Sequence, residues 1–222
     1  MSFLSDLFRK KTDYKAGGLI LSEIPFSATL VKTPEQFVAP KKVDFRDMCI
    51  ETSNQGQFPH CAGYATAGYI EVQNWKRLHY PKQVDGDVIY FEAKKIDGDN
   101  SAGTTLQSAV KSALNLNLIT GKAEYIEGGR ENLKFAIHEF GVCIAGFNIT
   151  QDWNNVGSDG KIPCKDHRKI GGHAVLICGF DSEGIYIQNS WSSTWGLYGF
   201  CLLSWSQFDD QFMQGMIIRQ AA

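Results

Sequence analysis

The 222-residue chain has no charge excess and no long apolar run, and each shortage excludes a class of protein. Lys and Arg number 22 against 24 Asp and Glu, which gives a formal net charge of −2. The sequence therefore lacks the broad positive field that nucleic-acid binding needs. Its longest apolar runs, such as Ala174 to Cys178, fall far below the roughly 18 residues that span a bilayer. We expect a soluble protein with no nucleic-acid partner and no membrane partner.

The N-terminus lacks the pattern of a secretory signal. Its basic residues, Arg9 to Lys11, come after a very short apolar stretch, whereas a signal peptide begins with basic residues and continues with about 7 to 15 apolar ones. We therefore expect a cytoplasmic protein, or one released by a signal-independent route.

Cysteine is also sparse, and its spacing excludes a disulfide-dense scaffold. The six cysteines show no CxxC pair, and a chain of this length does not need disulfides to stabilise its core. If one cysteine is a catalytic nucleophile, five remain, and an odd number without an export signal favours reduced thiols. Their positions are Cys49, Cys61, Cys143, Cys164, Cys178 and Cys201.

What the chain does contain is a set of polar residues at two short spacings. Gln55 stands six residues before Cys61, and His173 stands sixteen before Asn189. Nucleophilic catalysis by sulfur needs a thiolate, an imidazole that takes the thiol proton, and a third polar group that orients the ring. Cys61, His173 and Asn189 are the candidates for these three roles.

The order Gln, Cys, His, Asn and both spacings resemble the papain family of cysteine peptidases. In that family the Gln side chain, here Gln55, helps form the oxyanion hole. The segment Val-Asp-Phe-Arg from Val43 resembles the start of the mature papain-like domain. The block Asn-Ser-Trp from Asn189 resembles a second motif of the family, so the resemblance runs from Val43 to the C-terminus.

The resemblance implies further roles in the site. Gly103, in the turn before a predicted helix, would pair its backbone with the substrate, and Gly172 would present its backbone to the residue before the scissile bond. Trp191 would shield the His–Asn hydrogen bond from water, which strengthens that bond because the local dielectric falls. Trp195 would line the leaving-group side. No metal or organic cofactor is implied, and the partner would be a protein or peptide substrate.

The chain also departs from the family pattern around the nucleophile. Phe58 stands where the family has a cysteine, so the disulfide that this cysteine would make is absent, and Ala62 replaces the usual aromatic residue. The separation between Cys61 and His173 is shorter than the roughly 130 to 150 residues of the family. These departures indicate a trimmed version of the fold.

Helical patterns come first along the chain and strand patterns later, which argues for an α+β protein. The resemblance implies a papain-like two-lobe fold, with a helical lobe, a β-barrel-like lobe and the active site in the cleft between them. We predict helices at 62–75, 104–116 and 131–140, and strands at 142–149, 173–180, 184–189 and 198–204.

Residues 1–42 contain Pro25, Pro34 and Pro40 and show no sustained helical period, so they are predicted to be an extension. It is either a short prosegment that blocks the cleft or a permanent packing arm or partner-binding tail. The peptidase domain would then occupy residues 43–222. Its helical lobe would cover about 53–125, and its β-rich lobe about 126–215 together with 43–52.

The predicted activity is that of a thiol endopeptidase acting through an acyl-enzyme. Two alternatives stay open: a papain-like transpeptidase, amidase or deamidase that acts on a specialised amide, and a catalytically silent binding module. The intact quartet argues against the silent module. His60 precedes the nucleophile, and its ring is expected to point away from the thiol. Cys164 and His167 lack the second ligand pair that zinc needs, so a loop is predicted there.

Overall fold

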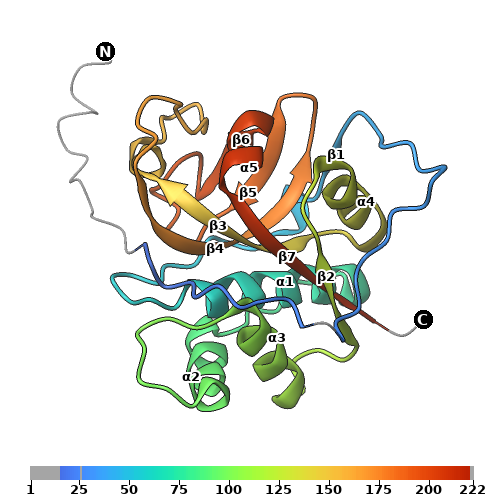
Figure 1. Ribbon diagram of the computed structural model, residues 1–222, viewed down its shortest axis with the longest axis vertical. Helices are drawn as coiled ribbons and strands as arrows, with labels where there is room; N and C mark the ends of the chain where they lie inside the picture. Colours follow the sequence, from blue (N-terminus) through green and yellow to red (C-terminus); the bar gives the residue numbers. More distant parts are fainter. Residues whose placement is uncertain (1–15, 26, 221–222) are drawn as a thin grey trace.

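The computed structural model describes residues 16–25 and 27–220, which form five α-helices and a seven-stranded antiparallel sheet (Figure 1). The helices are α1 (Cys61–Leu78), α2 (Gly86–Asp97), α3 (Leu106–Asn115), α4 (Arg130–Phe140) and α5 (Trp205–Gln211). The strands are β1 (Val43–Asp44), β2 (Lys122–Ile126), β3 (Cys143–Thr150), β4 (Lys169–Phe180), β5 (Gly184–Gln188), β6 (Phe200–Ser204) and β7 (Phe212–Arg219). None of the helices formed by the described residues has the length and apolar character to cross a membrane.

The elements separate into two lobes, which Figure 1 shows one above the other. Helices α1, α2 and α3 pack together in the lower lobe, and the sheet with α4 and α5 makes the upper one. The strand order is β2-β7-β3-β4-β5-β6, and β1 pairs with β4. Helix α1 lies at the boundary between the lobes, because it packs against both α2 and β4.

Small residues allow α1 to be buried on nearly all sides. Its first half is Cys-Ala-Gly-Tyr-Ala-Thr-Ala-Gly, and most of these residues are inaccessible to solvent. A Cβ atom at Gly63 would stand 2.3 Å from the carbonyl oxygen of Gly86. Only glycine therefore permits α1 and α2 to cross this closely, and the crossing fixes the start of α1 against α2.

Strand β4 holds the centre of the upper lobe because it pairs with β3, β5 and β1. In the β3 pairing, His173 stands opposite Phe147 and Gly172 opposite Asn148. Side chains alternate between the two faces of a strand, so the ladder fixes on which face the His173 ring stands.

The predicted extension contacts both lobes. Residues 16–20, named here the cleft strap, lie between the lobes, where Leu19 bridges to Thr104. Residues 28–31, named here the sheet arm, follow the edge of the sheet. The N–H groups of Val31 and Tyr125 donate to Tyr125 O and Thr29 O at 2.8 and 2.9 Å, and Val31 is buried. The sheet arm thus extends the sheet beyond β2.

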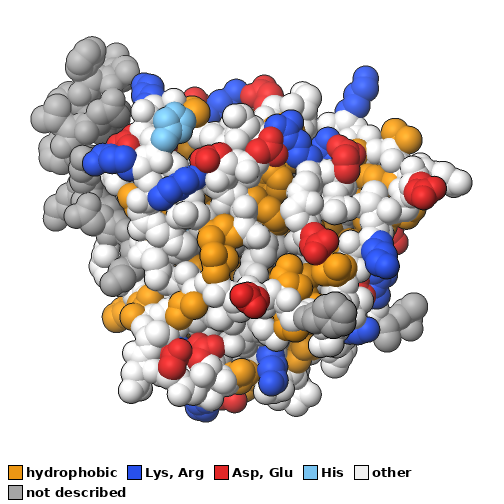
Figure 2. All heavy atoms as spheres, viewed as in Figure 1, with side chains coloured by type: hydrophobic (Ala, Val, Ile, Leu, Met, Phe, Trp, Pro, Cys, Tyr) orange, Lys and Arg blue, Asp and Glu red, His pale blue; other side chains and the backbone are white. Residues whose placement is uncertain are grey.

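The observed elements confirm the predicted α+β class and correct its details. The predicted helices correspond to α1, α3 and α4, and the predicted strands to β3, β4, β5 and β6. The predicted lobe boundary at 125/126 falls inside β2, which already pairs with β7. Helices α2 and α5 and strands β1, β2 and β7 were not predicted. On the face shown in Figure 2, acidic and basic side chains are interspersed, as the small net charge suggests.

Candidate active site

Cys61 is the first residue of α1 and is completely buried. A helix N-terminus favours a thiolate, but burial opposes it and raises the pKa of Cys61 to about 11. The strongest opposing influence is a hydrogen bond from the backbone of Ala174, which places the thiol beside the residue that follows His173. In this closed state the thiol is protonated at neutral pH.

His173 lies on β4 and is also completely buried. Its Nε2 atom is 2.7 Å from Asn189 Oδ1, which also accepts the N–H of Ser190 at 2.8 Å. Because this amide oxygen only accepts, Nε2 carries the proton of the neutral ring and Nδ1 keeps a lone pair. Nδ1 has no hydrogen-bond partner among the residues that the structure describes. It is therefore the nitrogen available to take a proton.

Burial favours the neutral form of His173, as it favours the neutral form of Cys61. Burial lowers the pKa of His173 to about 4, and the hydrogen bond to Asn189 only partly opposes this shift. A protonated thiol and a neutral imidazole are thus the favoured pair in the closed site. Desolvation disfavours the charged forms. Admission of water would therefore lower the pKa of Cys61 and raise the pKa of His173, which favours a thiolate and an imidazolium.

Gln55 is held by two hydrogen bonds close to the catalytic residues. Its Oε1 atom accepts from Ser190 Oγ at 2.6 Å, and its Nε2 atom donates to Phe58 O at 2.7 Å. Ser190 therefore contacts both the predicted oxyanion donor and, through its N–H, the amide that orients His173. An amide nitrogen has two hydrogens, and the bond to Phe58 uses one of them.

Two tryptophans contact the imidazole, and a third packs against both of them. The Trp191 ring centroid is 4.6 Å from that of His173 with an interplanar angle of 31°, and Trp153 meets the imidazole edge to face at 6.0 Å. Trp191 is completely buried, which suits its predicted shielding role. Trp195 is only 3% exposed, and its indole N–H donates to Trp153 O at 2.9 Å. Its role on the leaving-group side stays a prediction.

The cleft strap lies between the two walls of the cleft. The N–H groups of Gly17 and Leu19 donate to Gly172 O at 2.9 and 3.3 Å. On the opposite wall, Thr104 N–H donates to Gly18 O at 3.1 Å, and Ile20 N–H donates to Thr104 O at 3.0 Å. Gly172 and Thr104 are thus the residues that pair with the cleft strap, and Thr104 is one position after Gly103. The predicted contacts of Gly172 and Gly103 with a substrate stay predictions.

Glycines leave room for the cleft strap on both walls. A Cβ atom at Gly172 would stand 2.4 Å from Leu19 O, and one at Gly103 would stand 2.6 Å from Gly18 O. A Cβ atom at Gly146 would stand 2.5 Å from Leu19 Cδ2. Leu19 is 6% exposed, so its side chain is buried against β3 at Gly146.

His60, the residue before the nucleophile, is turned toward α2. Its Nδ1 atom is 2.7 Å from Asp87 Oδ1, and its ring stacks on Tyr90 at a centroid distance of 3.7 Å. Phe58, which stands where the family has a cysteine, is 63% exposed and stacks on His60. All six cysteines lie among the described residues, and all are free.

The predicted loop at Cys164 contains no ligand set. Cys164 is exposed, and no cluster of three or more His, Cys, Asp or Glu in the described part of the chain has an arrangement suited to a metal ion.

Several site residues were not predicted from the sequence. Thr104 and Ser190 lie directly beside predicted residues, and Ser190 belongs to the Asn-Ser-Trp block, so that block was the signal for it. Nothing in the sequence pointed to Trp153, because a single tryptophan in a short turn forms no repeating hydrophobic pattern. The double glycine at Gly17 and Gly18 was the available sign of a chain passing through a narrow space.

Comparisons with known proteins agree with this geometry. No protein-family model matches the chain. Cysteine proteinase 3 of Entamoeba histolytica is 25% identical over 210 residues, which cover 82% of this chain and 68% of the relative.

Solved structures resemble the chain over most of its length. Xylellain, a cysteine protease from Xylella fastidiosa, superposes with a TM-score of 0.81 at 19% identity, covering 96% of this chain and 98% of its own. Procathepsin B S9 from Trypanosoma congolense gives 0.73 at 14% identity, with 93% and 87% covered. Digestive procathepsin L2 from the larval midgut of Tenebrio molitor gives 0.73 at 17% identity, with 99% and 83% covered. The prediction of a papain-like fold is confirmed, and the prediction of a cysteine peptidase agrees with the names of the curated relative and of xylellain.

Proposed function

We propose that this chain is a papain-like cysteine peptidase that hydrolyses peptide bonds within protein or peptide substrates, with Cys61 as nucleophile and His173 as base and acid. The observation that carries the proposal is the state of His173. Its Nε2 atom is held by Asn189 at 2.7 Å, while its Nδ1 atom has no partner in the described part of the chain. The thiol of Cys61 lies beside the next residue of the same strand.

The reaction proceeds in two halves. Once the cleft is open, His173 takes the proton of Cys61, and the thiolate attacks the scissile carbonyl carbon. Gln55 and the backbone N–H of Cys61 stabilise the oxyanion, a donor arrangement whose loss commonly costs about 10² to 10³ in rate. His173 then protonates the leaving amine as the C–N bond breaks, which leaves a thioester.

The thioester is cleaved by water. His173 removes a proton from the water as it attacks the acyl carbon, and it returns that proton to the Cys61 sulfur as the carboxylic acid leaves. Asn189 keeps the imidazole in one orientation through both halves. Trp191 excludes water from the His173–Asn189 hydrogen bond and so strengthens it.

Covalent labelling tests the assignment of the nucleophile. We expect an epoxysuccinyl inhibitor to modify Cys61 among the six cysteines, as located by peptide mass mapping. The adduct should be absent from Cys61→Ala and strongly reduced in His173→Ala. The Cys164→Ala variant is the matched control, because Cys164 is free and exposed but lies outside the site. Absence of a Cys61 adduct in the folded protein would overturn the assignment.

We further propose that the cleft strap keeps the enzyme latent, which develops the expectation of a prosegment. Residues 17–20 bond to Gly172 on one wall and to Thr104 on the other, so a substrate cannot reach the thiol while they are in place. The sheet arm is part of the sheet edge. Displacement of the strap alone is therefore enough to open the cleft, and the arm can stay.

A protease site inserted after Ser22 tests latency, because Leu21 and Glu23 are exposed. Cutting there should raise hydrolysis of a fluorogenic peptide while residues 28–42 stay bound. In the uncut chain, alkylation of Cys61 by iodoacetamide should accelerate up to high pH, since burial raises the thiol pKa to about 11. After cutting, exposure should lower that pKa and shift the profile toward neutral pH. Equal profiles before and after cutting would contradict latency.

A further inference from the structure

The helical wall of the cleft is a loop, and no disulfide holds it. Thr104, which pairs with the cleft strap, follows a turn between α2 and α3, and all six cysteines of the chain are free. A loop that presents its backbone groups to another peptide segment must itself be held in place, because alternative conformations of the loop would lower its affinity for that segment.

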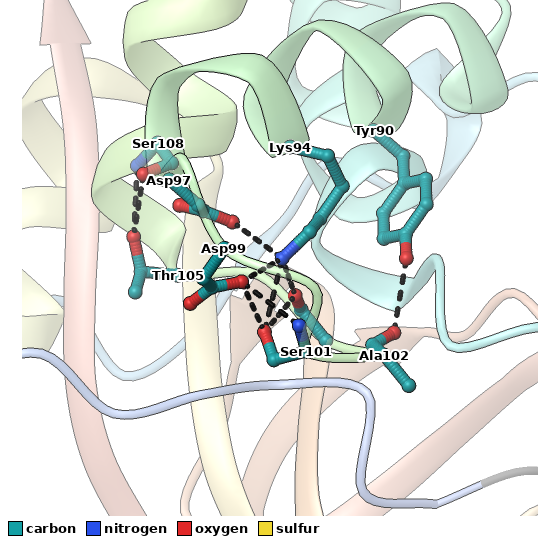
Figure 3. A network of polar contacts seen from close by, with 9 residues as sticks. Tyr90, Lys94, Asp97, Asp99, Ser101, Ala102, Thr105 and Ser108 are labelled. Carbon is teal, nitrogen blue, oxygen red and sulfur yellow. Dashed lines mark hydrogen bonds and ion pairs between the residues drawn. The ribbon is translucent and has the colours of Figure 1, made fainter.

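Lys94 of α2 stands at the centre of this turn (Figure 3). Its Nζ atom is 3.2 Å from Asp97 Oδ2, 2.6 Å from Asp99 Oδ1, 2.9 Å from Ser101 Oγ and 2.9 Å from Gly103 O. The turn is thus folded around the ammonium group. The last of these contacts reaches the residue directly before Thr104.

Burial distinguishes Lys94 from its neighbour on the same helix. The Lys94 side chain is 16% exposed and is bonded to two carboxylates, which compensate for the loss of hydration. The Lys95 side chain is 72% exposed and has an ion pair with Glu92, an arrangement that contributes little to stability. Lys94 is therefore anchored where Lys95 is not.

Tyr90, one turn earlier on α2, contacts the same loop. Its hydroxyl donates to Ala102 O at 2.9 Å (Figure 3), and its ring stacks on His60, the residue before Cys61. Helix α2 therefore holds the carbonyls of Ala102 and Gly103 and also contacts the start of α1. It connects the cleft edge to the nucleophile.

We propose that Lys94, supported by Tyr90, is a positioning residue of the active site: by holding the Gly103 carbonyl it fixes the peptide edge at Thr104 on which the cleft strap and the substrate lie. The substrate part of this proposal rests on the proposed peptidase function. The Gly103 carbonyl faces Lys94, while the N–H and C=O of Thr104 face the strap. Loss of the ammonium frees the preceding peptide to rotate and misaligns that edge.

Hydrogen exchange of the full chain tests the proposal without requiring catalysis. In Lys94→Met, the amides of Leu19, Ile20 and Thr104 should exchange at least about fivefold faster, as loss of a hydrogen bond to a charged group implies. Lys94→Arg should restore most of the protection, and Lys95→Met is the matched control on the same helix. Unchanged exchange in Lys94→Met would overturn the proposal even if the chain hydrolyses no peptide.

Peptide hydrolysis gives a second readout that a purely structural role would not produce. In a background with the strap displaced by Gly18→Val, Lys94→Met should raise KM at least about fivefold and leave kcat within about twofold, because Lys94 touches neither Cys61 nor His173. A fall in kcat with KM unchanged would contradict the proposal that Lys94 positions the peptide edge at Thr104.

A neutralised variant covers the case in which Lys94→Met leaves its carboxylate partners uncompensated and fails to fold. Lys94→Met combined with Asp97→Asn and Asp99→Asn removes the charges together. The same loss of protection at Thr104 is expected in it, and retention of full protection would overturn the proposal.

Discussion

The two walls of the cleft are built by different means. On the sheet side, Gly172 and His173 belong to β4 and pair with Asn148 and Phe147 of β3. On the helical side, Thr104 belongs to a loop that is held by side chains of α2. A ladder of backbone hydrogen bonds does not depend on any one side chain, whereas the loop depends on very few.

This difference divides the two tasks of the site. The chemical groups His173 and Asn189 stand on the wall that the sheet makes rigid, and the edge that receives an extended chain stands on the wall that side chains hold. Substitutions on the sheet side should therefore reduce the rate of chemistry. Substitutions that loosen the loop at Thr104 should reduce the binding of the chain in the cleft, whereas Cys61, at the start of α1, belongs with the chemical groups.

The largest effect is expected from Asn189→Ala, on the rigid wall. It removes the partner of His173 Nε2, so the ring loses its orientation, and kcat should fall on the order of 10²-fold with little change in KM. Steady-state kinetics measure the split. Asn155→Ala, at an exposed position, should be neutral. A rise in KM without a fall in kcat would contradict the assignment of the chemical step to the sheet side of the cleft.

The next effect concerns the strap that lies between the walls. In Gly18→Val, the added Cβ would stand 2.7 to 2.8 Å from backbone atoms of Pro59, so the strap should leave the cleft and peptidase activity should rise about tenfold. Leu21→Ala is the control, because Leu21 is 50% exposed. Exchange rates at Leu19 report displacement, and displacement without any gain in activity would contradict latency.

A smaller effect is expected from Tyr90→Phe, on the wall that side chains hold. The variant loses the hydrogen bond to Ala102 O and keeps the stacking on His60. In the strap-displaced background KM should rise about threefold to fivefold, which corresponds to a single neutral hydrogen bond. Tyr80→Phe, at an exposed position, is the control. Equal KM values would show that Lys94 alone holds the loop.

The smallest effect on activity, but a clear one on stability, is expected from Glu71→Gln behind the cleft. Burial raises the pKa of Glu71 to about 7, and the N–H of Val84 only partly opposes this. Between the ordinary carboxyl pKa and 7 the folded state holds the proton and the unfolded state does not. Stability should therefore fall as the pH rises through that window, by at most about 3 kcal/mol.

Thermal unfolding from pH 5 to pH 8 measures this slope. Glu71→Gln keeps an oxygen for the Val84 N–H and cannot ionise, so its melting temperature should vary less with pH than that of the unmodified chain. Glu127→Gln is the control at an exposed position. Identical slopes in the Glu71→Gln and unmodified chains would show that Glu71 does not ionise in this range.

The sequence was informative where local patterns and chemistry coincide. The spacing of Gln55 to Cys61 and of His173 to Asn189 predicted four residues that the fold brings into one place, because a motif records chemistry that needs fixed residue types. The small residues of α1 also gave a clear helical pattern. Helix α2 did not, because Val88 and Phe91 are exposed and blur the apolar face on which a helical period depends.

Other features depend on tertiary contacts that no local pattern records. Strand β7 contains Gln214 and Gly215, both buried between its neighbours, so its sequence does not alternate cleanly. The strap pairs with Thr104, one residue after Gly103, because a turn of unknown geometry does not show which peptide faces the cleft; the contact of Gly103 with substrate stays a prediction. The role of Lys94 could not be predicted from the sequence, because it depends on four acceptor atoms that converge on its ammonium group only in the folded chain.

The sheet arm gives the cleft strap a property that a separate inhibitor lacks. Because Thr29 is fixed to β2, the strap is tethered close to its own binding site, and a short flexible tether commonly gives an effective concentration in the millimolar range. Weak intrinsic affinity is then sufficient to keep the cleft closed. A single cut between Ile20 and Thr29 would turn the strap into a dilute ligand, so one bond controls occupancy without any change in the contacts themselves.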